Sequence, residues 1–469
     1  MEGLRQKIGV PLAIILSAAI WFMTTPAGLS LEGKKSLSLF VGIFVLYLTE
    51  AIPLPVSSLL IVPAAVLMGI VNVKGALDGF ASSSVYLIVG AFILAVAMVR
   101  TRLAERITYL VLLRTGSSPT RITLGVAIAN TVLAFLVPSA TARTALLLPM
   151  CLSIISLFKT EGRSKFAINL LLTLAFTNAT ISAGVLTATV PNPVTVEFLA
   201  KVTGQGVSYL DWLVYGFPPA AIMTFITWWL IQRVYRPEEE STPGGVERTI
   251  RENLRAMGKM TAAEKRALSV FLLVTFLWAT QNITKLDTTV VCLAGACLLF
   301  LPKFGVIEWS DANKGVSWQV VLVCGGGVSL RDILMKTGAA KWVATSVFKM
   351  LGLQGASTLV MLIVIMFIVQ YMHVIFVGTT AMATALLPII LAMAEAAHVN
   401  PLVLGLPAGM IIGGYPLLMF YNTLPNIIVY GTGKLEVGDF PRVGIALSAI
   451  ACVIYALCAA TYWRWLGLF

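Results

Sequence analysis

The sequence predicts an all-α polytopic membrane protein, and three observations carry that prediction. Of its 469 residues, 58% are hydrophobic and only 12% are charged, whereas about a quarter of the residues in soluble domains carry a charge. The mean hydropathy is +0.91. Apolar stretches of about 20 residues recur along the chain, and each is long enough to cross a hydrocarbon layer of ~30 Å.

The apolar stretches divide into continuous and interrupted ones. The first, 8–25, follows a short basic start, and it is interpreted as a retained helix because no small-x-small cleavage pattern follows. Small polar residues, proline or glycine interrupt three others, 121–158, 356–398 and 401–430. The remaining candidate spans are 36–52, 53–71, 85–112, 166–189, 209–232, 265–284, 287–301, 318–350 (interrupted by glycines) and 441–465.

Basic residues gather in the short connections between spans, which accounts for the net charge of +12. An excess of Lys and Arg in short loops is typical of the cytoplasmic side of membrane proteins. We therefore expect contact with anionic lipid and no binding of nucleic acid. The longest polar connection, 236–264, divides the chain into two halves. The i, i+3 spacing of Leu254, Met257 and Met260 within it predicts a surface-lying helix with an apolar stripe. The basic residues of the short connections include Arg100, Arg102, Arg106, Arg114, Lys159, Arg163 and Lys165.

The reactive side chains predict neither a metal site nor a cofactor. The six cysteines lie in apolar runs without a Cys-x-x-Cys spacing, and the chain has only two histidines. The glycine-rich 324–329 lacks the Lys-Ser/Thr of a phosphate loop, which argues against an ATP-driven pump. An integral membrane enzyme needs clustered acids or histidines at a membrane face, and none is visible, so we do not expect an enzyme.

Two motifs recur in the same order in the two halves. Residues 138–149 read PSATARTALLLP and 377–388 read VGTTAMATALLP; later each half carries a Thr-x-Pro-Asn, at 189–192 and 423–426. Corresponding interruptions in two halves are the best sequence indication of a transporter's binding site. A channel would instead show a pore-lining ring supplied by several subunits. The identical pairs of the first motif are Thr141/Thr380, Ala142/Ala381, Leu147/Leu386, Leu148/Leu387 and Pro149/Pro388.

The first motif of each half is suited to bind an anion. Ser139 and Thr141 are good N-caps for a helix over 142–158, and Thr379 and Thr380 stand in the same place before 381–393. Gly378 allows a tight turn. Free N–H groups and hydroxyls at such a helix start can donate to a carboxylate. The alternative is that these hydroxyls bond back to carbonyls and only pack helices.

The second motif of each half predicts a break in a helix. Pro191 and Pro425 remove a backbone donor. The neighbouring Asn192 and Asn426 then satisfy the freed carbonyls or reach a ligand. Thr189 and Thr423 begin the two Thr-x-Pro-Asn motifs. The two motifs of each half make four interruptions, and we expect all four to converge on one cavity that binds a small doubly anionic solute.

Two cationic or titratable side chains lie beside these motifs. Arg143 is well inside 121–158, where no acid is available to pair with it, so a transported carboxylate would supply its partner. The alternative is an arginine close enough to an interface to snorkel. His373 lies five residues before Gly378 and either faces the same cavity or is a satisfied core histidine.

At these motifs the chain resembles the divalent anion/sodium symporter family, which includes dicarboxylate and citrate carriers. In that family each half carries a re-entrant hairpin with a Ser-Asn-Thr tip, matched here by Ser139-Ala140-Thr141 and Gly378-Thr379-Thr380. An unwound Thr-Pro-Pro-Asn-like segment follows, matched by 189–192 and 423–426. The resemblance implies about eleven spanning helices and two hairpins in an inverted repeat, in a homodimer that moves a transport domain as an elevator at the inner (plasma) membrane.

The resemblance also implies a division of the chain into scaffold and transport parts. The expected parts are 1–115 (N-terminal scaffold helices), 116–235 (first transport half, hairpin 121–158 and broken helix 166–200), 236–264 (cytoplasmic connector), 265–352 (second scaffold half) and 353–469 (second transport half, hairpin 356–398 and broken helix 401–430).

The tips depart from the sodium-coupled members of the family. Their Asn helps to bind sodium, whereas this chain has Ala140 and Thr379 there, and alanine has no side-chain oxygen for a hard cation. Its Ser-x-Thr-Ala-Arg instead resembles the sodium-independent exchangers. We therefore expect Arg143 and His373 to replace the sodium charge in exchange of C4/C5 dicarboxylates (succinate, malate, fumarate or 2-oxoglutarate). The alternative is sodium-coupled symport of di- or tricarboxylates or sulfate.

Overall fold

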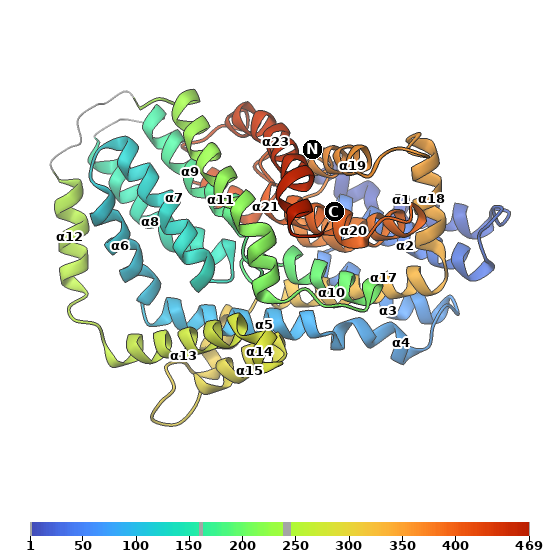
Figure 1. Cartoon of the computed structure of the whole chain (residues 1–469), viewed down its shortest axis with the longest axis horizontal. Helices are drawn as coiled ribbons and strands as arrows, with labels where there is room; N and C mark the ends of the chain where they lie inside the picture. Colours follow the sequence, from blue (N-terminus) through green and yellow to red (C-terminus); the bar gives the residue numbers. More distant parts are fainter. Residues whose placement is uncertain (1, 159–162, 238–244, 469) are drawn as a thin grey trace.

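The structure is a computed structural model that describes residues 2–158, 163–237 and 245–468, and within them it is all-helical, without a β-strand (Figure 1). Among the described residues, seven helices are long and apolar enough to cross a membrane, and five shorter apolar helices accompany them. The predicted all-α polytopic class is therefore confirmed. Lys159 and the part of the predicted connector at 238–244 lie outside the described residues.

The helices follow one another along the described chain with short connections. They are α1 (Glu2–Phe22), α2 (Leu31–Thr49), α3 (Leu54–Leu67), α4 (Val73–Leu77), the 3-10 helix η1 (Asp78–Ala81), α5 (Ser83–Arg100), α6 (Leu103–Thr115), α7 (Pro119–Leu136), α8 (Ala140–Leu157), α9 (Lys165–Ser182), α10 (Pro191–Thr203), α11 (Tyr209–Val234), α12 (Val246–Ala256), α13 (Ala262–Ala279), α14 (Gln281–Thr284), α15 (Thr288–Leu298), α16 (Trp309–Gly315), α17 (Trp318–Lys336), α18 (Ala339–Met350), α19 (Thr358–Met372), α20 (Thr379–Ala396), α21 (Pro401–Gly414), α22 (Leu424–Tyr430), α23 (Asp439–Cys458) and the π-helical η2 (Ala459–Trp463).

Two of the predicted single spans are pairs of longer helices, each of at least 12 residues. The stretch 85–112 turns between α5 and α6 at Arg102, and 318–350 turns between α17 and α18 at Gly338. Both residues adopt the left-handed conformation, with φ of 61° and 75°, which ends a helix by redirecting the chain. The glycines of 324–329 do not interrupt α17, contrary to the expectation, because the interruption lies after them.

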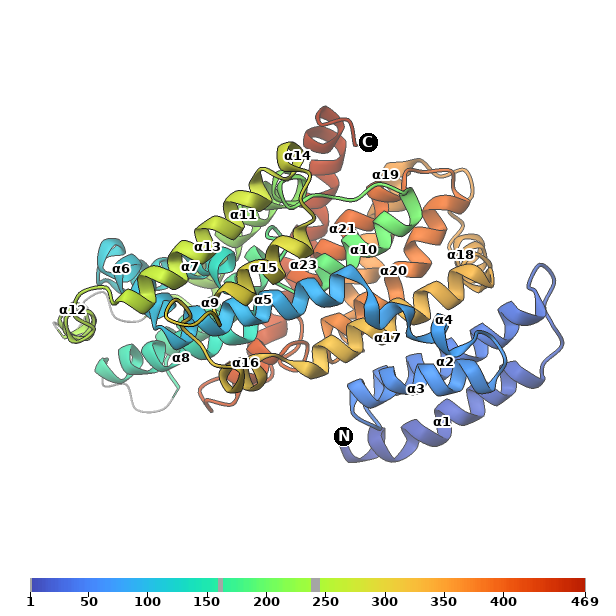
Figure 2. The same ribbon diagram turned by 90° about the horizontal axis from the view of Figure 1, so that it is seen from below.

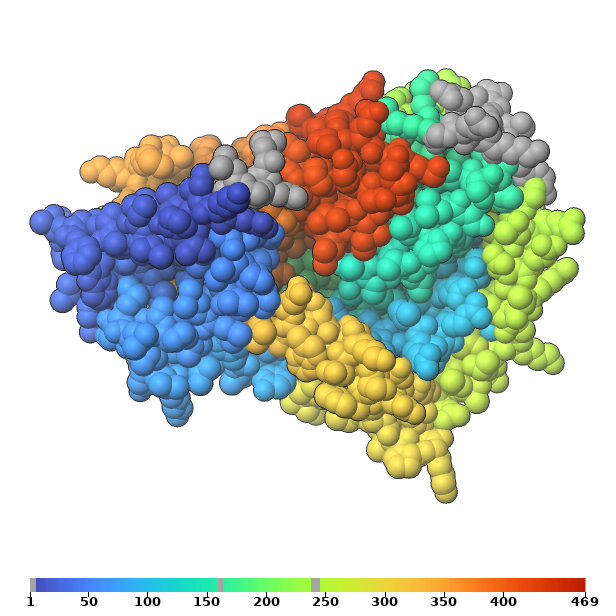
Figure 3. Space-filling model, turned by 180° about the vertical axis from the view of Figure 1, so that it is seen from behind, coloured from blue at the N-terminus to red at the C-terminus, as the bar shows by residue number. Residues whose placement is uncertain are grey.

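The two halves interlock through their hairpins and broken helices. Helix α22 of the second half packs against α8 and α9 of the first, and α10 of the first half packs against α20 and α21 of the second. Figure 3 shows this contact on the surface, where the red C-terminal segment lies against the teal hairpin segment. Helices α1, α2 and α3 pack together at one side (Figure 2).

Gly413 lets the two broken helices cross at their interruptions. A Cβ atom at this position would lie 2.9 Å from Asn192 Oδ1 and 2.9 Å from Thr189 Cγ2. Both distances are shorter than ordinary carbon contacts, so a side chain here would separate the helices. The crossing thus places the first Thr-x-Pro-Asn directly against the end of α21.

The connector docks on the helix that leads into the first hairpin. Helix α12 packs against α6 with Val246 and Ile250 buried. Of the predicted apolar stripe, only Leu254 belongs to α12, because the helix ends at Ala256, before Met257 and Met260. The connector does form a helix, but its buried residues are Val246 and Ile250 and not the predicted stripe.

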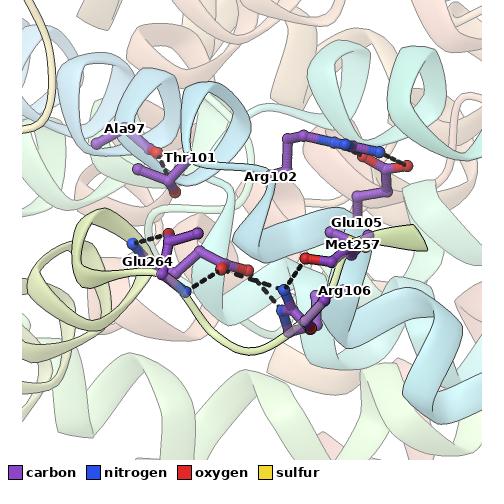
Figure 4. Close-up of polar contacts among 9 residues, drawn as sticks. Ala97, Thr101, Arg102, Glu105, Arg106, Met257 and Glu264 are labelled. Carbon is purple, nitrogen blue, oxygen red and sulfur yellow. Dashed lines mark hydrogen bonds and ion pairs between the residues drawn. The ribbon is translucent and has the colours of Figure 1, made fainter. Parts of the chain in front are cut away.

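Arg106 of α6 fixes the far end of the connector (Figure 4). Its Nε lies 2.5 Å from Glu264 Oε1, and its Nη1 donates to the carbonyl of Gly258 at 2.9 Å. The Glu264 side chain also accepts from Thr261 N and so completes the cap of α13. The side chains of Arg106 and Glu264 are only 12% and 2% exposed.

Replacing Arg106 with alanine is expected to destabilise the protein by about 3 kcal/mol or more, because it leaves a buried carboxylate unpaired. Thermal unfolding of purified protein in detergent measures this. Arg102→Ala is the matched control: its ion pair with Glu105 is largely exposed, with side chains 58% and 29% accessible, and the expected cost is below about 1 kcal/mol. Equal losses for both variants would contradict the prediction.

Candidate functional site

The first hairpin tip forms a capped helix start. Ser139 is the N-cap of α8, with its Oγ accepting from Ala142 N at 3.2 Å. The Ser139 hydroxyl proton therefore stays available to donate. Contrary to the expectation, Thr141 is not a cap but lies in the first turn of α8, because the helix begins at Ala140 and not at 142. Ser139, Ala140 and Thr141 are half-buried.

The second tip has the same shape with a different cap. Gly378 is the N-cap of α20 and contributes no side-chain hydrogen bond. Thr379 and Thr380 are the first two residues of that helix and not residues ahead of it, which corrects the predicted helix start at 381. Gly378, Thr379 and Thr380 are all half-buried, like the residues of the first tip.

The prolines of the Thr-x-Pro-Asn motifs begin helices. Helix α9 ends at Ser182 and α21 at Gly414, whereas Pro191 is the first residue of α10 and Pro425 the second of α22. A proline is favourable there because those N–H groups have no helical partner. The chain is unwound before the prolines, at 183–190 and 415–423, so each predicted break lies on the N-terminal side of its proline.

The asparagines of these motifs satisfy carbonyl groups at the start of or within the unwound segments. Asn192 Nδ2 donates to the carbonyl oxygens of Ser182 and Val185 at 2.8 and 2.9 Å. Asn426 Nδ2 donates to those of Pro416 and Met419 at 2.8 and 3.1 Å. Both side chains are fully buried. Of the two roles that the sequence left open, the geometry shows the first, while Thr189 and Thr423 stay half-buried.

Arg143 joins the first tip to the first unwound segment. Its Nε donates to Asn178 Oδ1 at 2.7 Å, and its Nη1 donates to the Val137 carbonyl at 2.9 Å. Its Nη2 donates to Ser182 Oγ and, at 3.4 Å, to the Ala188 carbonyl. The side chain is 0% exposed, which excludes snorkelling. No carboxylate of the described residues pairs with it, so its charge is balanced only by neutral oxygens.

His373 occupies the corresponding region of the second half. Its ring is buried, with Nδ1 2.9 Å from the Gln370 carbonyl oxygen and Nε2 3.2 Å from that of Ile412. The ring thus bridges the end of α19 to α21 near the second break. It is engaged by the protein on both nitrogens, so the ring does not reach into an open cavity.

Two cavities lie along the seam between α5 and the first hairpin. The one at the tip is lined by Pro138, Thr189, Val190 and other residues of the break and α5, and its volume of about 10 Å³ holds about one water molecule. The second, of about 520 Å³, lies between α5, α6 and α8. Of the four interruptions, only the first tip and break line the smaller cavity, so this conformation does not bring all four to it.

The polar residues that organise the site beyond the motifs were not singled out from the sequence. Asn178 donates to the Ala140 carbonyl at 2.7 Å, and Gln370 Nε2 donates to the Tyr415 carbonyl at 2.8 Å. Asn422 Nδ2 donates to the Phe376 carbonyl at 3.2 Å and so ties the second tip to its break. An amide within an apolar run is the signal that could have identified them.

The comparisons with known proteins agree with this architecture. The family model of the sodium:sulfate symporter transmembrane region matches residues 5–469. The chain is 29% identical to a sodium-dependent dicarboxylate transporter, SdcS, of Staphylococcus saprophyticus, over 96% of this chain and 90% of that one. It is also 29% identical to a membrane protein of Cupriavidus necator, over 98% and 93%.

Solved structures show a related fold at low sequence identity. The YdaH transporter of Alcanivorax borkumensis superposes with a TM-score of 0.55 at 12% identity, covering 99% of this chain and 98% of that one. MtrF of Neisseria gonorrhoeae superposes with a TM-score of 0.61 at 11% identity, covering 97% and 93%. With the family match spanning nearly the whole sequence, this chain belongs to the sodium:sulfate symporter family of dicarboxylate and sulfate transporters and is a multi-pass protein of the plasma membrane.

Proposed function

We propose that this protein exchanges small C4/C5 dicarboxylates, such as succinate, malate, fumarate or 2-oxoglutarate, without sodium. The observation that carries the proposal is Arg143, a fully buried guanidinium without a carboxylate partner in the described chain. An uncompensated buried charge is costly. A bound dicarboxylate at the adjacent tip offsets that cost.

The guanidinium occupies the kind of oxygen cluster that a hard cation prefers. The carbonyls of Val137 and Ala188 and the hydroxyl of Ser182 accept its N–H groups. Carbonyl and hydroxyl oxygens are also ligands for hard cations. With Arg143 among them and Ala140 without a side-chain oxygen, the first half carries a fixed positive charge in place of a bound ion.

The second half has its own candidate cation in His373. Both ring nitrogens face backbone carbonyl oxygens. A neutral imidazole donates one hydrogen bond and an imidazolium donates two, so only the charged form satisfies both acceptors, whereas the full burial of the ring favours the neutral form. A second carboxylate bound nearby would favour the charged form, and one positive charge in each half would then match a substrate with two carboxylates.

Built-in charge favours exchange over net transport. A carrier that returned empty would carry uncompensated charges across the membrane, which is unfavourable. A carrier that returns with a second dicarboxylate avoids that cost. The proposed donors to the two carboxylates are the hydroxyls of Ser139, Thr141, Thr379, Thr380, Thr189 and Thr423, with the backbone N–H groups of Ala140 and Gly378.

The larger-scale mechanism is part of the same proposal. Residues 1–115 and 265–352 form the scaffold, and 116–235 and 353–469 form a transport domain that moves as an elevator within a homodimer. The cavities between α5 and the first hairpin support this division, because they leave free space along the seam where the two parts would slide.

Sodium-coupled symport is the second candidate. The names of the SdcS relatives favour it, because those proteins are sodium-dependent dicarboxylate transporters. Under this alternative, Ser139, Thr379 and backbone carbonyls would hold the ion.

Counterflow in proteoliposomes separates the two candidates. We expect uptake of labelled succinate only into vesicles preloaded with unlabelled dicarboxylate, at the same rate in sodium and in choline buffers. Empty vesicles with an inward sodium gradient serve as the comparison. Uptake into those empty vesicles would establish symport and overturn the exchange proposal.

A further inference from the structure

The asparagines of the two breaks show the same bonding pattern in both halves. Asn192 donates to carbonyls ten and seven residues earlier, those of Ser182 and Val185, and Asn426 donates to those of Pro416 and Met419 at the same spacings. An amide group has only two N–H donors. Both donors of each residue are therefore engaged by carbonyl groups at the start of or within the unwound segment that precedes it.

The remaining atom of each amide is unsuited to bind an anion. The Oδ1 atoms of Asn192 and Asn426 are buried and have no donor partner among the described residues. An amide oxygen only accepts hydrogen bonds, and carboxylates offer none when ionised. In addition, Asn192 Oδ1 lies over Gly413 at the helix crossing and not at the tip.

An unwound segment presents two opposite electrostatic signs to a ligand. Its N–H groups attract a carboxylate, and its C=O groups repel one, since both lack helical partners. A site for an anion therefore needs accessible N–H groups and no unpaired C=O groups facing the ligand. In each break the asparagine engages two of the carbonyls, which partly neutralises their negative potential.

We propose that Asn192 and Asn426 are positioning residues that shield the anion site from the carbonyl groups of the breaks. They hold the unwound backbone so that its N–H groups and the Thr189 and Thr423 hydroxyls are left to the substrate. This inference rests on the proposed dicarboxylate site, but it holds for exchange and for symport alike.

The test uses a substitution that replaces the N–H donors of the asparagine by a negatively charged group. Asn192→Asp keeps the shape of the side chain and replaces two donors by a carboxylate facing two carbonyls. Binding of succinate is compared with binding of its monoamide, succinamate, at pH 7.5 by thermal shift and by competition for transport. The ratio of the two affinities reports charge at the site, whereas a purely structural defect weakens both ligands equally.

We expect Asn192→Asp and Asn426→Asp each to lower the affinity for succinate by at least about tenfold. The affinity for succinamate is expected to fall much less. The matched control is Asn169→Asp, because Asn169 is equally buried in α9 and donates to the Tyr235 carbonyl at 2.9 Å, away from the breaks. In this control the affinity ratio is expected to stay at the wild-type value.

Asn192→Ser covers the possibility that an aspartate variant fails to fold. It keeps one donor without adding charge, and we expect an intermediate loss of succinate affinity. The shielding role would be overturned if the folded variants lost affinity equally for succinate and succinamate. It would also be overturned if their affinity for both ligands were unchanged. Failure of the wild-type protein to bind succinate would instead overturn the proposed function.

Discussion

Exchange of dicarboxylates is expected to fall by more than about 100-fold when Arg143 is replaced by alanine, with the protein still folded. The guanidinium is fully buried at the junction of the first tip and break. At a separation of ~5 Å and an effective dielectric constant of ~20, its attraction for one carboxylate is about 3 kcal/mol. A loss of that size corresponds to more than two orders of magnitude in affinity.

Counterflow of labelled succinate and size-exclusion profiles of the same preparations measure this result. Arg121→Ala is the matched control, because Arg121 is in the same hairpin but exposed to solvent, and it should exchange at the wild-type rate. Arg143→Lys keeps the charge without the branched donors, so we expect a partial loss. Exchange at the wild-type rate in folded Arg143→Ala would refute the counter-charge role.

Gly444→Ala is expected to cost about 3 kcal/mol or more in stability, and with it most transport. A Cβ atom at this position of α23 would lie 2.0 Å from the Leu417 carbonyl oxygen. Leu417 belongs to the second unwound segment, so the obstacle is backbone and cannot rotate away. Overpacking typically costs about 1–3 kcal/mol, and more where nothing yields. Helix α23 is therefore expected to separate from the break.

Thermal unfolding and succinate counterflow check this prediction. Gly438→Ala is the matched control, because Gly438 precedes α23 and has a φ of –70° that alanine adopts without strain. A Cβ atom at Gly438 would meet nothing within 4 Å, so we expect this variant to match the wild-type protein. A stable Gly444→Ala that transports normally would show that the close approach is unimportant.

The interruptions were readable from the sequence because each depends on local chemistry. Ser139 caps α8 through a bond three residues away, and such caps follow from residue type and spacing. The exact helix starts were less accurate. Pro191 and Pro425 were expected at the breaks themselves, and each lies in the first turn of the helix that follows its break, since a proline disrupts the turn before it and favours the first turn after it.

The roles of the polar amides needed the fold. The sequence left Asn192 free to satisfy carbonyls or to reach a ligand, and the choice depended on where the unwound segment placed the carbonyls of Ser182 and Val185. His373 was similar: its Nε2 faces the carbonyl of Ile412, a residue of a different helix. Contacts between helices distant in sequence leave no local pattern.

The sequence by itself determined the membrane class, the duplicated motifs and the unusual arginine, because hydropathy, repetition and residue type are properties of short segments. The tertiary structure alone decided that Arg143 is held by Val137, Ser182 and Ala188, and that α22 packs on the first hairpin while α10 packs on the second. Those facts depend on how the two halves interlock. The physical reason is that a buried polar group takes whichever partners the packing brings within hydrogen-bond distance.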